Sequence, residues 1–130
     1  MQHAFIKLVS KSKTQSVSLD DIKELFQYYK IITSQTGTQI HYAYANFAFP
    51  YEIVDTSNST LELKSNHERY NCIYVGVDSE NDQTFIQISL PSTATFGDKG
   101  KANEFCRFLA KKLEGELQLF NGRTMYFYKR

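Results

Sequence analysis

Hydrophobic positions recur along this chain with two different periods, one typical of helices and the other of strands. Two stretches repeat an apolar residue every three or four positions, which places those side chains on one face of a helix. The first runs from Ser18 to about Thr36 and the second from Ala102 to Leu113. Ser18 can cap the first helix, and Gly37 is placed to end it. The spacing therefore predicts two amphipathic helices.

Alternating apolar and polar residues predict strands in the rest of the chain, because successive side chains of a strand point to opposite faces. The expected strands cover residues 4–9, 39–45, 51–54, 61–64, 70–77, 85–90, 117–119 and 123–128. A hydrophilic loop over residues 78–83 joins two central strands, and Asn121-Gly122 is typical of a type I′ turn between the last two. Gly115 is expected to close the second helix in the left-handed conformation.

This order of elements predicts an α+β fold, in which a mostly antiparallel sheet carries two amphipathic helices on one face. The length of 130 residues favours a single domain spanning residues 1–130. The expected core combines the two helical stripes with one face of the sheet. Its members are Ile6, Leu8, Ile22, Leu25, Phe26, Tyr29, Ile73, Val75, Ile86, Ile88, Phe105, Leu109 and Leu113.

The balance of charge counts against nucleic acid as the partner, although it leaves room for a small local basic patch. Fifteen basic residues against fourteen acidic residues leave a formal net charge of +1, without the strong positive field of a dedicated nucleic-acid binder. No apolar run is long enough for a transmembrane helix, and the N-terminal sequence does not have the basic segment of a secretory signal. We therefore expect a cytoplasmic protein with no membrane partner.

Histidine and cysteine supply the side chains most often used in metal sites and in nucleophilic catalysis. His3, His41 and His67 lie in separate predicted elements, and neither Cys72 nor Cys106 has a partner at metal-ligand spacing. We expect no metal and no cofactor. A Cys–His pair could be assembled only in space, and the packing face of the second helix disfavours a thiolate at its cysteine. The sequence therefore names no catalytic residue.

Glycine and lysine gather ahead of the second helix, in the stretch Gly97-Asp98-Lys99-Gly100-Lys101. Glycine lets backbone amides approach a ligand, and a helix N-terminus offers unpaired donors to an anion. The spacing does not match a P-loop, which needs four residues between its glycines. One hypothesis is a phosphate-group or single-stranded nucleic-acid site, and the other is a structural turn with Asp98 as helix N-cap. The anion site would comprise Gly97, Lys99, Gly100, Lys101 and Arg123.

Aromatic residues are unusually frequent, with nine tyrosines and ten phenylalanines but no tryptophan. Several alternate along predicted strands and can share one face of the sheet. A helix over that face would make the rings part of the core, whereas uncovered rings could stack nucleobases or form a protein or homodimer interface. The candidate interaction face comprises Tyr42, Tyr44, Tyr70, Tyr74 and Phe85.

Three stretches of the chain form a recognisable combination: Ala4-Phe5-Ile6-Lys7-Leu8-Val9, Gly97-Asp98-Lys99-Gly100-Lys101-Ala102-Asn103-Glu104-Phe105-Cys106 and Leu119-Phe120-Asn121-Gly122-Arg123. This combination resembles a domain-of-unknown-function family of small, uncharacterised cytosolic proteins from bacilli and their relatives. The resemblance extends along the whole chain. It implies a single-domain bacterial protein, and it implies no activity, cofactor or catalytic residue.

These patterns favour a non-enzymatic binding or protein-interaction module. Its partner would be an unknown protein or a second copy of the chain, bound through the aromatic face or the last hairpin. Binding of a phosphate group or single-stranded nucleic acid at residues 97–101 is the first alternative. A small enzyme of unknown class is the second, and it would require a pocket that joins Cys106, a histidine and a carboxylate.

Overall fold

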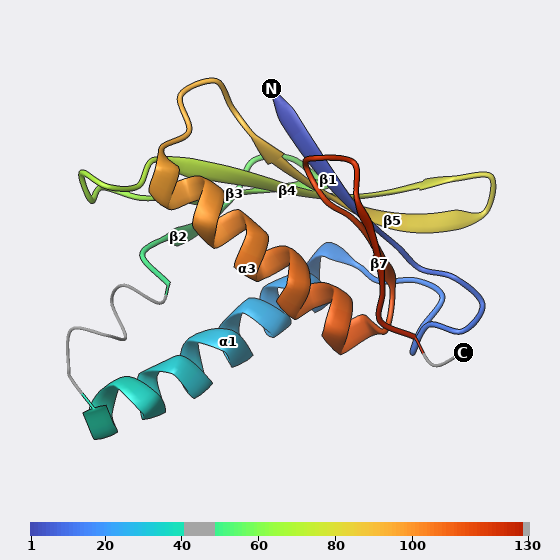
Figure 1. Ribbon diagram of the computed structural model, residues 1–130, viewed down its shortest axis with the longest axis horizontal. Helices are drawn as coiled ribbons and strands as arrows, with labels where there is room; N and C mark the ends of the chain where they lie inside the picture. Colours follow the sequence, from blue (N-terminus) through green and yellow to red (C-terminus); the bar gives the residue numbers. More distant parts are fainter. Residues whose placement is uncertain (41–48, 129–130) are drawn as a thin grey trace.

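An antiparallel sheet of seven strands forms the centre of the part of the chain that the structure describes (Figure 1). The computed structural model describes residues 1–40 and 49–128, and for residues 34–40 it describes the backbone alone. The strands lie in the order β2-β3-β4-β5-β1-β6-β7 across the sheet. Their bounds are β1 Gln2–Lys7, β2 Glu52–Asp55, β3 Thr60–Lys64, β4 Cys72–Glu80, β5 Gln83–Leu90, β6 Glu116–Gln118 and β7 Thr124–Tyr126.

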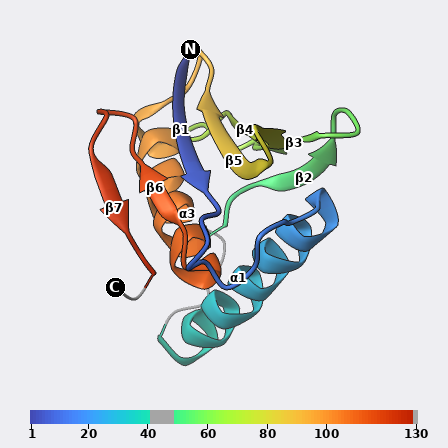
Figure 2. The same cartoon turned by 90° about the vertical axis from the view of Figure 1, so that its right-hand side faces the viewer.

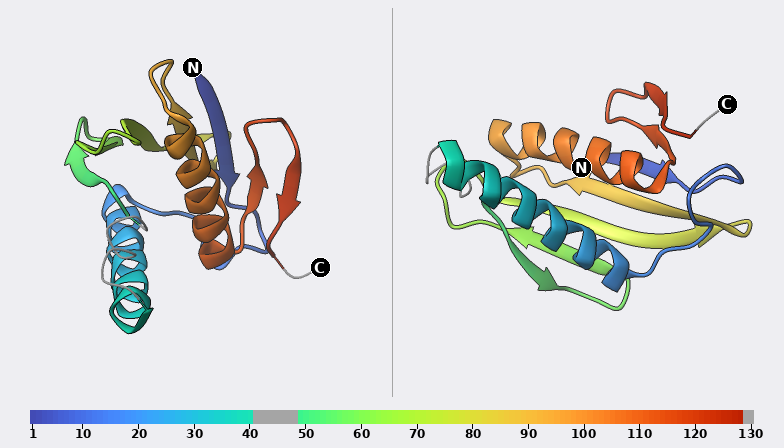
Figure 3. Two further views of the ribbon diagram at one scale, coloured as in Figure 1. Left: turned by 60° about the vertical axis from the view of Figure 1, so that its left-hand side comes forward. Right: turned by 90° about the horizontal axis from the view of Figure 1, so that it is seen from below.

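Two helices, α1 (Leu19–Ile40) and α3 (Phe96–Leu113), lie on the same side of this sheet. The view from below in Figure 3 shows both helices in front of the strands, and Figure 2 shows β1, β6 and β7 side by side with α3 behind them. The predicted α+β fold, with a mostly antiparallel sheet and two amphipathic helices on one face, is therefore confirmed.

Aromatic rings attach the helices to each other within the core. The ring centroid of Phe105 on α3 lies 5.4 Å from that of Phe26 on α1 and 5.3 Å from that of Phe49. Every predicted core residue is buried except Leu25 and Tyr29, which are partly buried and pack against the core. The core prediction succeeds because each member lies on a helical stripe or on one face of a strand.

Strand alternation gives the sheet a second face, which neither helix covers. In β1 the side chains of Ala4 and Ile6 are buried on the helix side, whereas His3, Phe5 and Lys7 point to the other side. We call this second surface the open face. It comprises His3, Phe5 and Lys7 of β1, Glu52 and Val54 of β2, Thr60, Glu62 and Lys64 of β3, Cys72, Tyr74, Gly76, Asp78 and Glu80 of β4, Gln83, Phe85, Gln87 and Ser89 of β5, and Glu116 and Gln118 of β6.

Helix α1 begins as predicted but runs further. The Ser18 and Asp21 side chains cap it reciprocally, with the Asp21 amide donating to Ser18 Oγ at 3.1 Å and the Ser18 amide donating to Asp21 Oδ2 at 2.9 Å. Gly37 does not end the helix, which continues to Ile40. The predicted strand at residues 39–45 is therefore wrong at Gln39 and Ile40, and its remainder lies outside the described residues. A single glycine lowers helix propensity by only about 1 kcal/mol, which surrounding turns can offset.

The two predicted hairpins exist, but the type I′ turn lies in the β4–β5 hairpin and not in the β6–β7 hairpin. Asn81 and Asp82 have φ values of 54° and 61°, and Glu80 pairs with Gln83. This is a two-residue type I′ turn, so the predicted six-residue loop is wrong. At Asn121-Gly122 only Gly122 has positive φ, and its amide donates to the Leu119 carbonyl at 2.9 Å. That hairpin closes through a three-residue loop instead of a type I′ turn.

The end of α3 also differs from its prediction. Glu114, not Gly115, adopts the left-handed conformation, with φ 52° and ψ 48°. Gly115 is needed for close packing, because a Cβ there would lie 3.0 Å from both the Ile6 side chain and the Lys7 carbonyl oxygen.

Substitution Glu114→Gly should raise the free energy of unfolding by about 1 kcal/mol, because glycine enters the left-handed region without the steric penalty of a side chain. Denaturant unfolding would measure the change. Glu114→Ala is the matched control, since it removes the same charge from the negative end of the helix dipole and should gain at most about 0.5 kcal/mol. Equal gains from both variants would assign the effect to charge and not to backbone conformation.

Candidate functional site

The predicted anion-binding stretch is not a loop but the first turns of α3. The helix begins at Phe96, and its N-cap is Thr95, not Asp98 as one hypothesis held. The Thr95 hydroxyl oxygen accepts from the Asp98 amide at 3.0 Å, and the Asp98 carboxylate accepts from the Thr95 amide at 3.0 Å. Thr95 and Asp98 thus form a capping box.

Asp98 is fully buried and holds three segments of the chain together. Its Oδ1 accepts from the Tyr51 hydroxyl at 2.5 Å, and both carboxylate oxygens lie 3.0 Å from the Asn71 amide. The start of α3 is therefore fixed to the segments that precede β2 and β4. A carboxylate already stands at the helix N-terminus, where an external anion would have to bind.

The two glycines of this stretch have different surroundings. A Cβ at Gly97 would lie 2.5 Å from the Arg69 carbonyl oxygen and 2.8 Å from the Tyr70 ring, whereas a Cβ at Gly100 would meet nothing within 4 Å. Gly97 therefore serves close packing within the protein. Its conformational freedom is not needed, since it lies in a regular helix.

The basic residues of the predicted site lie on different surfaces. Lys99 lies over the ring of Phe96, 5.4 Å from its centroid, and Lys101 pairs with Glu104 at 3.0 Å. Arg123 lies in the exposed turn between β6 and β7, and Figures 1 and 3 show that turn well apart from the start of α3. The structure thus brings residues 97–101 together in one helix and leaves Arg123 on another element.

Alkaline pH should destabilise the protein through Tyr51. Burial, reinforced by the Asp98 carboxylate, raises the pKa of the Tyr51 phenol well above its ordinary value. A folded-state pKa above the unfolded value of about 10 stabilises the fold below pH 10, and this contribution is lost as pH rises further. We expect the free energy of unfolding to fall by up to about 1.4 kcal/mol per pH unit more steeply than in Tyr51→Phe. Denaturant unfolding between pH 9 and 11 would measure both slopes, and equal slopes would contradict this assignment.

A row of neighbouring side chains crosses the open face from β3 to β1, and its members on β5 and β1 are hydrogen-bonded. Glu62, Tyr74, Ser89 and His3 are direct partners in successive strand pairs. Ser89 Oγ is hydrogen-bonded to His3 Nδ1 at 2.7 Å, and Gln87 Nε2 lies 2.9 Å from the same nitrogen and 3.2 Å from Ser89 Oγ. His3 Nδ1 therefore has two hydrogen-bonding neighbours, Ser89 and Gln87. An activated serine would need the histidine nitrogen as its own base, so this network orders the surface and does not identify Ser89 as a nucleophile.

Two phenylalanines lie side by side next to this row. The Phe5 and Phe85 rings meet edge to face, with centroids 6.0 Å apart, and both side chains are half-buried. The structure thus places Phe85 and Tyr74 on the open face. Tyr70, which was assigned to the same face, instead packs against the buried Tyr51 ring on the helix side, with centroids 5.7 Å apart. It precedes β4 and so does not follow the alternation of that strand.

The predicted aromatic face and the open face share only some residues. Tyr42 and Tyr44 lie outside the described residues. His3, Phe5, Gln87 and Ser89 belong to the open face without having been predicted there, although all four alternate with core positions of β1 or β5. That alternation indicates which face each side chain occupies. It does not indicate that β1 and β5, which are distant in the chain, are neighbours in the sheet.

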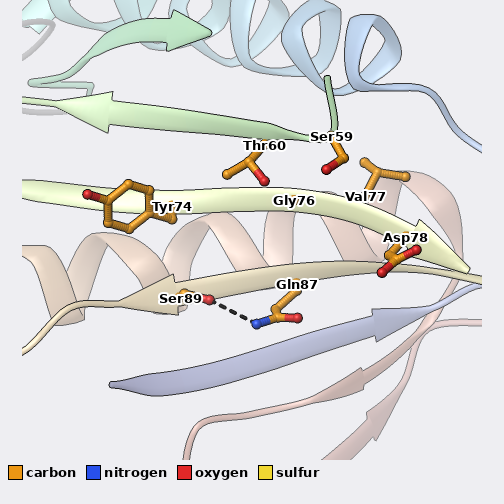
Figure 4. A pocket seen from close by; sticks show the side chains of 8 residues that line it. All are labelled: Ser59, Thr60, Tyr74, Gly76, Val77, Asp78, Gln87 and Ser89. Carbon is orange, nitrogen blue, oxygen red and sulfur yellow. Dashed lines mark hydrogen bonds between the residues drawn. The ribbon is translucent and has the colours of Figure 1, made fainter. Parts of the chain in front are cut away.

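Two hollows mark the open face. One lies over Gly76 and encloses about 150 Å³, and Figure 4 shows the side chains around it. The other, of about 600 Å³, lies around Phe5 and Phe85 and is bordered by Lys7, Glu80, Asn81, Gln83 and Gln118. The two hollows share β5 as their common boundary.

Neither cysteine is placed for nucleophilic chemistry. Cys106 is fully buried, and burial raises the pKa of its thiol to about 12. Burial also raises the pKa of the Cys72 thiol, and the Glu62 carboxylate adds to this effect. Among the residues that the structure describes, no group of three histidine, cysteine, aspartate or glutamate side chains could hold a metal ion. Neither described helix is long and apolar enough to cross a membrane.

A thiol reagent at pH 8 should therefore leave Cys106 unmodified in the native protein, because reaction requires an exposed thiolate. Both cysteines of the chain should react once guanidinium unfolds it, and released thiolate absorbance would measure each stage. The Cys106→Ser variant, while folded, should release thiolate at the same rate as the folded wild type. Rapid native labelling of Cys106 would overturn this expectation and restore a cysteine-based enzyme as a hypothesis.

Three comparisons relate this chain to known proteins. A family model described as a domain of unknown function, DUF1885, matches residues 2–129. A crystal structure of a protein of unknown function from Bacillus stearothermophilus is similar, with 43% sequence identity and a TM-score of 0.64. That match covers 88% of this chain and 92% of the Bacillus chain. Comparison with functionally curated proteins finds no match.

Proposed function

This chain belongs to the domain-of-unknown-function family DUF1885, and we propose that it is a cytoplasmic binding module that holds a protein partner against the open face of its sheet. The observation that carries the proposal is the Phe5–Phe85 ring pair, half-buried on a face that neither helix covers. The uncovered face of an antiparallel sheet is usually polar. Aromatic side chains are enriched in protein interfaces, where they supply much of the binding energy.

The surroundings of the ring pair support a protein partner over a nucleic acid. The open face carries the carboxylates Glu52, Glu62, Asp78, Glu80 and Glu116, against the two lysines Lys7 and Lys64. A nucleic acid would need the opposite balance of charge, because phosphate contacts dominate its affinity. The hydrogen-bonding row beside the rings resembles the polar rim of a protein interface.

The proposed location rests on the cysteines. Cys72 and Cys106 are both free and buried, and free thiols are typical of proteins in a reducing compartment. The resemblance to cytosolic proteins agrees with this placement.

Photo-crosslinking in the host cell would test the proposal. Benzoylphenylalanine in place of Glu62 or Gln118 samples the open face, and the same residue in place of Lys111 on α3 is the matched control. We expect covalent protein products from the two sheet positions and none from Lys111. A covalent dimer of the chain would identify the partner as a second copy. Products from Lys111 alone would contradict the proposal and transfer the interface to the helices.

A further inference from the structure

The hollow over Gly76 is a gap in an otherwise occupied row of side chains. Tyr74, Gly76 and Asp78 alternate on the open face of β4, and only Gly76 contributes no side chain. The neighbouring strands close the gap with Thr60 on one side and Gln87 on the other, which are the register partners of Gly76. Figure 4 shows the Tyr74 ring at one end and the Asp78 carboxylate at the other.

The size of this hollow fits one side chain. Its volume of about 150 Å³ is below the roughly 300–1,000 Å³ of small-molecule sites. Gly76 and Asp78 are two residues apart on a strand that rises about 3.3 Å per residue, so they lie about 7 Å apart, which is close to the length of an extended lysine or arginine side chain. A long side chain whose backbone lies on the Tyr74 side of Gly76 can therefore pass over Gly76 and reach the Asp78 carboxylate.

The chemistry of the lining selects the charge of that side chain. The polar lining residues are neutral except Asp78, and none of the lining residues is lysine, arginine or histidine. Asp78 accepts a hydrogen bond from the Ser79 amide at 2.8 Å and has no ion pair within the described part of the chain. An anion would meet a carboxylate here, whereas a cation would gain one.

We propose that the hollow over Gly76 takes a lysine or arginine side chain of the protein partner, with its charged end paired to Asp78 and its aliphatic part lying over Gly76. This inference rests on the proposed function, because it assigns a subsite within the same open face. The acidic balance of that face favours a partner with a positively charged contact surface.

Nuclear magnetic resonance of the labelled full chain would test the subsite with defined probes. The probes are N-acetyl-lysine N-methylamide and its uncharged norleucine analogue. We expect the lysine probe to cause saturable shifts at the Gly76, Asp78 and Gln87 amides, and the norleucine analogue to cause none. Asp78→Asn should weaken lysine-probe binding by about fivefold. Asp82→Asn is the matched control, because it removes the same charge from the exposed β4–β5 turn, which does not line the hollow, and it should leave binding unchanged.

A second variant tests the shape of the subsite. Gly76→Val fills the hollow, and its Cβ meets neighbours no closer than 3.4 Å, so the variant should fold and lose the lysine-probe shifts. Equal shifts from both probes, or equal weakening by Asp78→Asn and Asp82→Asn, would overturn the inference. If crosslinks at Glu62 and Gln118 persist in that case, the binding face stands and only the subsite fails. If the open-face crosslinks are absent, the proposed function fails and the subsite with it.

Discussion

Substitution of Gly97 by alanine should lower the free energy of unfolding by about 2 kcal/mol, whereas the same substitution at Gly100 should raise it by about 1 kcal/mol. The added methyl group at position 97 would lie 2.5 Å from the Arg69 carbonyl oxygen. A backbone oxygen cannot rotate away, so the contact acts as overpacking, which costs about 1–3 kcal/mol. At position 100 no atom lies within 4 Å, and alanine gains its higher helix propensity.

Denaturant unfolding of the two variants would measure this difference in sign. Both substitutions are identical and lie in the same helix, so each serves as the control for the other. If Gly97 instead existed to let a ligand approach, Gly97→Ala would unfold like the wild type and lose anion binding. That outcome would contradict the packing role and favour the anion-binding hypothesis for residues 97–101.

Replacing Asp98 by alanine should be more damaging, with a loss of about 4 kcal/mol. The Tyr51 hydroxyl and the amides of Asn71 and Thr95 all donate to this carboxylate, and alanine would leave these donors without their acceptor. Each unsatisfied buried group costs about 1–3 kcal/mol. Water that enters the vacated site replaces part of the lost acceptor, which keeps the loss near the lower end of the summed range.

Asp21 provides a matched control for this prediction. It holds the same capping-box position at the start of α1, but it is exposed, and within the described part of the chain its side chain is hydrogen-bonded to Ser18 alone. Asp21→Ala should therefore cost about 1 kcal/mol, the ordinary value of a cap. Similar losses at the two positions would show that Asp98 acts as a simple helix cap and does not hold the Tyr51 and Asn71 segments.

The faces of helices and strands could be predicted from the sequence because they depend on local periods. Ala4, Ile6 and Leu8 are buried and Phe5 is on the open face, as alternation requires. The capping of α1 by Ser18 followed in the same way. These features need no knowledge of which strand lies beside which.

Features that depend on tertiary contacts could not be predicted. Thr95 and Asp98 have the spacing of a capping box, but only the approach of Tyr51 and Asn71 makes Asp98 a buried junction. Gly97 looked like a ligand-binding glycine because the Arg69 carbonyl that requires it is distant in sequence.

The open-face row was hidden for the same reason. His3 and Ser89 are 86 residues apart in the chain, and nothing local to either residue indicates the other. The aromatic residues Tyr74 and Phe85 of this face could be predicted from the sequence, but the polar side chains that order it could not. A row that crosses four strands becomes visible only when the order of those strands is known.

The position of β1 between β5 and β6 has a consequence for the growing polypeptide. Strand β1 is synthesised early, but both of its neighbours follow much later in the chain. Ribosomes add roughly 5–20 residues per second, so β1 waits several seconds without a partner on either edge. Its apolar side chains are exposed to chaperones and to other nascent chains during that time. The β4–β5 hairpin is complete before β6 is synthesised, so β1 can pair with β5 first.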